Sequence, residues 1–262
     1  MTKRILLTGA GGFVGHHTLE HILTTTDWDV VCTDSFRHAG KVDRISEVLA
    51  SAPAHVNWRV DPDSLERTWW DRVTVVTQDL TVPFSDQTAE KIGHVDYIIS
   101  MASESHVDRS ISHPAEFISN NVSLVINLLE FHRRHVPDAI FLQVSTDEVY
   151  GPAPEGHNHA EWEPFLPSNP YSASKAAQES IAFSYWRTYG TPLILTSTMN
   201  IVGERQDTEK YLPMTISKIR SGETVHIHSS PEGVPGSRYY LHASNQADAL
   251  LYLLKAYSGG LD

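Results

Sequence analysis

The chain has 262 residues, 40% of them hydrophobic, which is enough to bury the core of a single domain or slightly more. The formal net charge of −12 argues against a nucleic-acid-binding surface, but it leaves room for phosphorylated ligands held by backbone N–H groups and a few local cations. The single cysteine, Cys32, excludes an internal disulfide and suits a reducing compartment. Because no signal-peptide pattern follows Met1 and no apolar stretch is long enough to span a bilayer, we expect a cytoplasmic protein with no membrane partner.

Apolar runs that suit buried strands alternate with helical patterns through roughly the first 200 residues. The expected strands, in chain order, cover residues 4–8, 29–33, 73–77, 97–101, 140–144 and 193–198. One helix is expected over residues 13–23, and two long helices over residues 115–135 and 171–189. This alternation predicts an α/β protein with a doubly wound parallel sheet of the Rossmann type, covered by helices on both faces.

Beyond residue 199 the pattern loosens, and Gly, Pro and polar turns dominate residues 229–237. We therefore predict a cofactor-binding and catalytic domain over residues 1–199 and a small, partly irregular substrate lobe over residues 200–262. Residues 51–71 look like an insertion after the second strand unit. Residues 152–169, rich in Pro, His and Glu, are a candidate active-site flap.

A glycine-rich turn lies between the first strand and the first helix. Gly9, Gly12 and Gly15 are spaced by three, which suits a tight turn, close approach of the backbone to a pyrophosphate, and close helix–strand packing. Phe13 and Val14 open the helix, whose N-terminal N–H groups would face the phosphates. The context predicts a dinucleotide site.

Acidic residues at two strand ends refine the cofactor. Asp34 stands about 20 residues past the glycines, where a carboxylate would bind ribose hydroxyls and favour NAD over NADP. Arg37 lies nearby and could soften that preference. Asp79 and Leu80 end the third strand, where adenine would lie, although a turn-forming aspartate explains Asp79 equally well.

The residues with the clearest chemistry follow the fifth strand. Thr146, Asp147 and Glu148 supply a hydroxyl and two carboxylates, and Tyr171 and Lys175 have the i,i+4 spacing that places them on one helix face. An ammonium beside a phenol favours the phenolate, so Tyr171 could act as a base. A possible acid and a possible second base beside it suggest an oxidation followed by another step.

Taken in this order, the Gly-x-x-Gly-x-x-Gly turn, Ser145-Thr146 and Tyr171-x-x-x-Lys175 resemble the extended short-chain dehydrogenase/reductases, the NAD-dependent epimerase/dehydratase group. Residues 102–110, 145–151 and 171–176, together with residues 209 and 210, are more specifically similar to the dTDP-glucose 4,6-dehydratases. The Asp-Glu pair is the specific part of this resemblance.

That resemblance implies a reaction. Tyr171 would take the proton of the sugar 4-hydroxyl while hydride passes to NAD, with Thr146 on the 4-oxygen. Lys175 would lower the pKa of the tyrosine and hold the nicotinamide ribose. Glu148 would remove the C5 proton, and Asp147 would protonate the departing 6-hydroxyl. Hydride return to C6 would give a 4-keto-6-deoxy sugar nucleotide.

The resemblance also implies binding residues and an assembly. Three residues would line the cofactor cleft: Ala102, Ser103 and Ser105. Five would contact the nucleoside diphosphate sugar: His106, Arg109, Asn200, Lys210 and Arg238. Asn121 is either a cofactor ligand or a buried structural residue. The two long helices would pair two copies into a homodimer.

Some positions depart from the family pattern. Val202 stands where a tyrosine often occurs, and His228 where a tyrosine is expected near the nucleoside. We expect no metal site, because a pair formed by His226 and His228 has no identifiable third ligand. The chain ends at Asp262, where relatives continue, so the lobe is either minimal or truncated.

Two alternatives stay open at this point. An epimerase or decarboxylase of a related sugar nucleotide would need no acid at C6, so replacing Asp147 would leave its turnover largely intact. A cofactor-binding scaffold that has lost activity would predict a damaged triad, yet Thr146, Tyr171 and Lys175 are all present.

Overall fold

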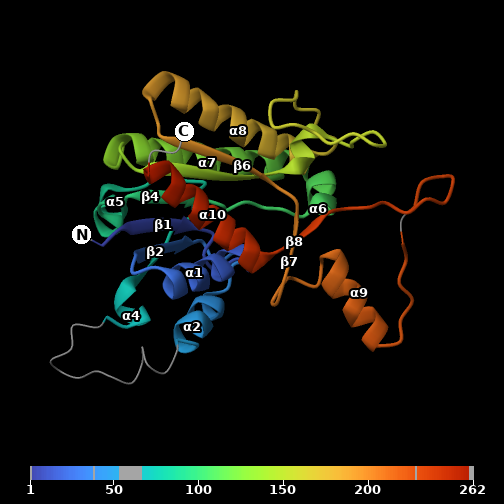
Figure 1. Ribbon diagram of the computed structural model, residues 1–262, viewed down its shortest axis with the longest axis horizontal. Coiled ribbons are helices and arrows are strands. Elements are labelled where there is room, and N and C mark those ends of the chain that lie inside the picture. The colour runs from blue at the N-terminus through green and yellow to red at the C-terminus, as the bar shows by residue number, and fades with distance from the viewer. Residues whose placement is uncertain (1, 38, 53–66, 228, 260–262) are drawn as a thin grey trace.

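The computed structural model describes residues 2–37, 39–52, 67–227 and 229–259. Its centre is a six-stranded sheet with the order β3-β2-β1-β4-β5-β6, in which every neighbouring pair is parallel (Figure 1). The strands are β1 (Arg4–Thr8), β2 (Asp29–Asp34), β3 (Val73–Thr77), β4 (Tyr97–Ser100), β5 (Ile140–Thr146) and β6 (Leu193–Thr198). The predicted doubly wound α/β sheet is therefore confirmed, with all six strands in place.

Helices cover both faces of this sheet. One face carries α1 (Phe13–Thr25), α2 (Val42–Ala50) and α10 (Ala243–Ser258), and the other carries α5 (Asp86–Ile92), α7 (Pro114–His135) and α8 (Pro170–Tyr189). Successive side chains of β1 point to opposite faces of the sheet, so the core has two parts. Ile5 and Leu7 pack with α1 and α10 on one face, whereas Leu6 packs with α7 on the other. Both predicted long helices are thus found within one residue of their expected bounds.

The strand order reverses beside β1, since β2 lies on one side of it and β4 on the other. In a doubly wound sheet, ligands bind beyond the carboxyl ends of the strands at such a point. The turns after β1 and β4 meet there closely, because a Cβ built on Gly9 would lie 3.0 Å from the Ala102 Cα. The fold therefore places the glycine-rich turn beside the residues that follow β4.

The C-terminal part is more open. Strands β7 (Asn200–Val202) and β8 (Tyr240–His242) form a separate parallel pair, and α9 (Tyr211–Arg220) buries none of its residues and projects away from the sheet (Figure 1). Helix α10 returns to pack against α1, with Leu250 and Leu254 in the same core as β1. A domain boundary at residue 199 remains a prediction.

Short elements absent from the sequence predictions complete the fold: α4 (Trp69–Arg72), α6 (Val107–Ser112) and a 3₁₀ turn (Asp147–Tyr150). Of the predicted insertion at 51–71, residues 53–66 lie outside the described part. Its last residues form α4, which begins with a capping box between Thr68 and Asp71 and buries Trp69. Among the helices of the described chain, none combines the length and apolar character required to cross a membrane.

Candidate active site

The glycine-rich turn has the backbone geometry expected of a phosphate-binding loop. Gly9 has φ +69° and donates its N–H to Thr33 O at 2.8 Å. Gly12 caps α1 without a side chain, and a Cβ on Gly15 would lie 2.0 Å from Gly9 O. Any residue other than glycine at position 15 would place its Cβ in contact with this carbonyl oxygen, so only glycine lets the helix pack this closely on the turn. No acidic residue occupies the first turn of α1, so its N–H groups stay suited to an anion.

Asp34 lies at the end of β2, directly beside this turn. Its carboxylate accepts hydrogen bonds from Gly11 N at 3.0 Å and from Phe36 N at 2.9 Å. Arg37, the cation nearby in the sequence, pairs instead with Asp79 at 2.9 Å. The carboxylate at the ribose position is thus fixed by the backbone, which suits NAD better than a 2′-phosphorylated cofactor.

Two residues near the turn escaped sequence reasoning. Arg44 on α2 is buried and donates to Gly11 O at 3.0 Å and to Arg205 O at 2.8 Å, so it ties the glycine turn to the C-terminal part. His16 on α1 is fully buried beside Gly12 O, and burial lowers its pKa to about 4. An arginine on an amphipathic helix gives no sequence signal, whereas His16 was findable as the residue directly after Gly15.

The segment after β4 is held by two buried polar side chains. Thr8 Oγ1 accepts from the N–H groups of Met101 and Ala102 at 3.0 and 3.1 Å. Asn121 on α7 accepts from Glu104 N at 2.9 Å and donates to Glu104 O at 3.0 Å. Its amide also donates to Ser174 Oγ at 2.9 Å. These contacts favour the role of a buried structural residue over that of a cofactor ligand.

Strand β5 delivers the predicted catalytic hydroxyl and carboxylates. Thr146 ends the strand and caps the 3₁₀ turn, accepting from Glu148 N at 3.3 Å. Its hydroxyl donates to Asp147 Oδ1 at 3.2 Å. Glu148 Oε2 accepts from the amide of Asn169 at 3.3 Å. The adjacent carboxylates thus have separate partners.

Tyr171 begins the helix that faces this turn. Asn169 forms a capping box with Ser172, and Pro170 at the first helical position fixes the start of α8. The Tyr171 phenol lies close enough to the Thr146 hydroxyl to interact with it, and it is within electrostatic reach of Glu148 and Asp147. Burial and the charge of Glu148 raise the pKa of Tyr171 in this arrangement.

Lys175 shares the helix face of Tyr171 but has other partners. Its Nζ donates to Val144 O at 2.7 Å and to Gln178 Oε1 at 2.6 Å. Burial lowers the pKa of Lys175 to about 8. The expected lowering of the Tyr171 pKa by this ammonium is therefore not found, because the ammonium is held by the backbone of β5 and by Gln178.

Only part of the predicted substrate set comes together. Lys210 Nζ donates to Ser105 O at 2.8 Å, and His106 lies 3.8 Å from Glu209, so residues 105–106 meet residues 209–210. Arg109 pairs with Glu104 at 3.0 Å.

The other predicted substrate residues lie apart from this contact. Arg238 is exposed and donates to Ser237 O, and Asn200 pairs with Tyr240 in the β7–β8 ladder. His228 lies outside the described residues.

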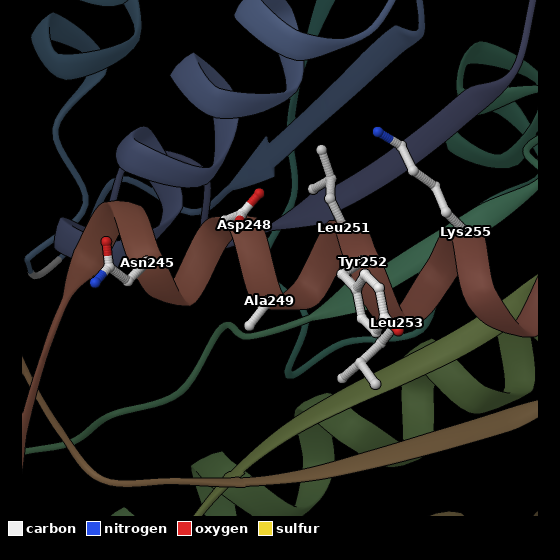
Figure 2. A pocket seen from close by; sticks show the side chains of 7 residues that line it. All are labelled: Asn245, Asp248, Ala249, Leu251, Tyr252, Leu253 and Lys255. Carbon is white, nitrogen blue, oxygen red and sulfur yellow. The ribbon is translucent and has the colours of Figure 1, made fainter.

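Of two surface hollows in the described residues, one lies apart from the predicted site and the other includes a predicted substrate residue. Figure 2 shows a hollow lined entirely by side chains of α10, among them Asp248, Tyr252 and Lys255. None of the predicted site residues lines it. A second hollow, between α6 and α7, includes Arg109 and Phe117.

The geometry can be compared with known proteins. Residues 5–262 match the family described as the NAD dependent epimerase/dehydratase family. The low-salt glycan biosynthesis protein Agl12 of Haloferax volcanii is 33% identical over 252 residues, which cover 96% of this chain and 73% of that protein. The dTDP-glucose 4,6-dehydratase of Neisseria meningitidis serogroup B is 33% identical over 257 residues, covering 95% of this chain and 66% of its own length.

A solved structure agrees with these relatives. DesIV, a dTDP-glucose 4,6-dehydratase from Streptomyces venezuelae crystallised with NAD and TYD bound, matches with a TM-score of 0.79 and 29% identity over 96% of this chain and 72% of that one. The chain thus spans about two thirds to three quarters of the length of these relatives. On the family match and these identities, the chain belongs to the NAD dependent epimerase/dehydratase family.

Proposed function

We propose that the chain acts as a nucleotide-sugar 4,6-dehydratase, converting a dTDP-glucose-like substrate to its 4-keto-6-deoxy product. The observation that carries the proposal is the placement of two separately bonded carboxylates, Asp147 and Glu148, directly after Thr146 and within electrostatic reach of Tyr171. An oxidation alone needs one proton relay, so a second acid and base suit an elimination. The identities to a dTDP-glucose 4,6-dehydratase and to DesIV support the same reaction.

NAD is the cofactor of this family, and the residues of the cleft fit it. The turn from Gly9 to Gly15 would receive the pyrophosphate, and Asp34 the adenosine ribose. Ala102, Ser103 and Ser105 would line the nicotinamide side, while Asp79 and Leu80 would lie near the adenine. When bound, NAD supplies an acceptor for the hydride and returns that hydride later in the cycle.

In the proposed mechanism, Tyr171 removes the proton of the sugar 4-hydroxyl, with Thr146 hydrogen-bonded to the same oxygen. The interaction of the Tyr171 phenol with the Thr146 hydroxyl supports this pairing. Lys175 is proposed to assist from the next helical turn by supplying a positive charge near the cofactor ribose. Its present partners, Val144 O and Gln178, keep the ammonium buried one turn from the phenol.

Glu148 and Asp147 divide the elimination. A ketone at C4 acidifies the C5 proton, which Glu148 takes while Asn169 orients its carboxylate. Asp147, protonated, gives its proton to the departing 6-hydroxyl.

The substrate would lie between residues 105–109 and the C-terminal part. We propose His106 and Arg109 on one side, and Asn200, Lys210 and Arg238 on the other, as contacts for the diphosphate and nucleoside. Residues 200–262 would then form the substrate lobe.

A homodimer through α7 and α8 is also proposed, because Phe183 and Trp186 on α8 are 50% and 41% exposed.

Products identify the reaction. The purified protein would be incubated separately with dTDP-glucose, UDP-glucose and UDP-N-acetylglucosamine, and the products measured by mass spectrometry. Loss of one water, about 18 mass units, without net NADH is the expected result for one of them. An unchanged mass with altered sugar stereochemistry would contradict the dehydratase and indicate an epimerase.

Replacing Asp147, the proposed acid, distinguishes a dehydratase from an epimerase by the rate of turnover. In a dehydratase, Asp147→Asn should slow water loss by roughly 100-fold, because general acid catalysis typically contributes 10²–10⁴-fold. An epimerase would keep its turnover. Glu155→Gln, an exposed acid in the neighbouring segment, is the matched control and should leave the rate unchanged.

A further inference from the structure

Three side chains of the segment between the catalytic turn and α8 converge on one point. His157 Nε2 lies 3.1 Å from Glu163 Oε2, and His159 Nδ1 lies 2.6 Å from the same oxygen. One ligand atom from each of the three residues lies within 4.8 Å of the other two. We propose that His157, His159 and Glu163 form a binding site for a divalent transition-metal ion such as Zn²⁺, which fixes this segment beside the active site.

The spacing of the three atoms fits a small cation. Zn²⁺ binds histidine nitrogen and carboxylate oxygen at about 2.0–2.2 Å, so ligand atoms of a tetrahedral site stand about 3.3 Å apart. The two nitrogen–oxygen distances, 3.1 and 2.6 Å, are shorter than that value, so the carboxylate oxygen would move away from the two imidazoles to admit an ion. Two imidazoles and one carboxylate are a donor set that zinc accepts, with one position open.

The supporting contacts of Glu163 also suit a metal. Ala160 N holds the second oxygen, Oε1, at 3.0 Å, which leaves Oε2 directed at the imidazoles. Such outer contacts orient a ligand before the ion arrives. The His157 side chain is 43% exposed, which provides an entry path.

The cluster is connected to the catalytic turn. The ring of Tyr150, the last residue of the 3₁₀ turn, stacks on His159 with centroids 5.6 Å apart, and its hydroxyl donates to Glu161 O at 3.1 Å. Leu166 N donates to Val149 O at 2.9 Å. An ion at the cluster would therefore hold residues 157–163 against the turn that carries Asp147 and Glu148. This site departs from the sequence expectation, which considered only His226 and His228.

Metal binding is tested directly, without relying on turnover. Chelator-treated full-length protein would be dialysed against Co²⁺ or Zn²⁺, with bound metal counted by mass spectrometry and Co²⁺ coordination read from its visible absorption. We expect one ion with a tetrahedral Co²⁺ spectrum in the wild type. His157→Ala and Glu163→Gln should each weaken binding by at least about 10-fold and remove the spectrum.

A matched variant controls for the many histidines of the chain. His21→Ala disrupts an exposed histidine–carboxylate pair with Asp248, far from the cluster, and should bind metal as the wild type does. Limited proteolysis gives a second measurement, because Zn²⁺ should protect residues 152–169 in the wild type and in His21→Ala but not in Glu163→Gln.

Two results would overturn the site. Equal metal occupancy in the wild type and in both cluster variants would place any bound ion elsewhere. A wild type that binds no metal above background would leave the three residues as a hydrogen-bonded cluster only. Neither result would contradict the proposed dehydratase activity, because that activity is tested by identifying its products.

Discussion

The two sides of the proposed cleft are built differently. On the cofactor side, main-chain contacts fix the turn, with Gly9 N on Thr33 O at 2.8 Å and Gly12 N on Gly9 O at 2.9 Å. On the substrate side, α9 buries none of its residues, and Lys210 reaches Ser105 through one long side chain. The turn of the proposed cofactor site therefore depends mainly on backbone geometry, whereas the proposed substrate contacts depend on individual side chains.

This difference indicates that ligand specificity can change more readily on the substrate side than on the cofactor side. A backbone-built site tolerates few substitutions, because each added atom meets main chain that cannot move. A site built from side chains can change its ligand by exchanging one of them. Substitutions on the two sides should thus separate cofactor binding from turnover and substrate affinity.

The largest effect is expected from Tyr171→Phe on the catalytic side. Removing the phenol oxygen should lower kcat about 10³-fold, because the proton of the sugar hydroxyl loses its acceptor. NAD affinity, measured by calorimetry, should stay nearly constant. Tyr185→Phe, on the same helix as Tyr171, removes a hydroxyl that donates to Glu130 on α7 and should retain turnover. If Tyr171→Phe keeps wild-type kcat, the assignment of the base is wrong.

Gly15→Ala tests whether backbone packing in the glycine-rich turn determines NAD affinity. The added Cβ would lie 2.0 Å from Gly9 O, so helix and turn must separate. Overpacking of this kind costs about 1–3 kcal/mol, which corresponds to roughly a 100-fold loss of NAD affinity at the upper end. Gly236→Ala, which meets nothing within 4 Å, should bind NAD normally. Unchanged NAD binding in Gly15→Ala would refute the backbone-built site.

Lys210→Met tests the side-chain-built half. The change removes a cation that donates to Ser105 O and should raise KM for the sugar nucleotide about 10-fold while NAD affinity stays constant. Arg220→Met, an exposed cation at the end of α9, serves as the control. An equal rise in KM for both variants would mean that only general charge matters.

The smallest effect concerns acid stability on the cofactor side. The pKa of His16 is lowered from 6.5 to about 4 in the folded chain, so the unfolded chain binds more protons between these values. Stability should accordingly fall as the pH drops from 6.5 towards 4. His16→Asn keeps a donor for Gly12 O but cannot titrate, and should reduce that loss by about 1 kcal/mol in denaturant unfolding at pH 6.

His94→Asn provides the comparison for this measurement. The His94 side chain is 78% exposed, so its replacement should leave the pH dependence of unfolding unchanged. A His16→Asn variant with the acid sensitivity of the wild type would show that other groups carry it.

Sequence patterns predicted the sheet because each of its strands is an apolar run with clear ends. The same reasoning missed α2, α9 and α10, since two of them lie in regions where polar residues interrupt the pattern and α2 is short. It grouped Thr146 with Tyr171 from the family resemblance, and the two side chains lie close enough to interact. It did not foresee the Lys175 contacts, because side-chain partners such as Gln178 depend on three-dimensional packing.

The amide of Asn121 has a mechanical consequence. Together with Gln178, whose Nε2 donates to Asn121 O at 2.6 Å, it fastens the segment after β4 to the catalytic helix α8 through buried bonds. Hinge motion cannot open the molecule at that seam without breaking them. The contact between Lys210 and Ser105, a single hydrogen bond at 2.8 Å, would be easier to break than this buried set.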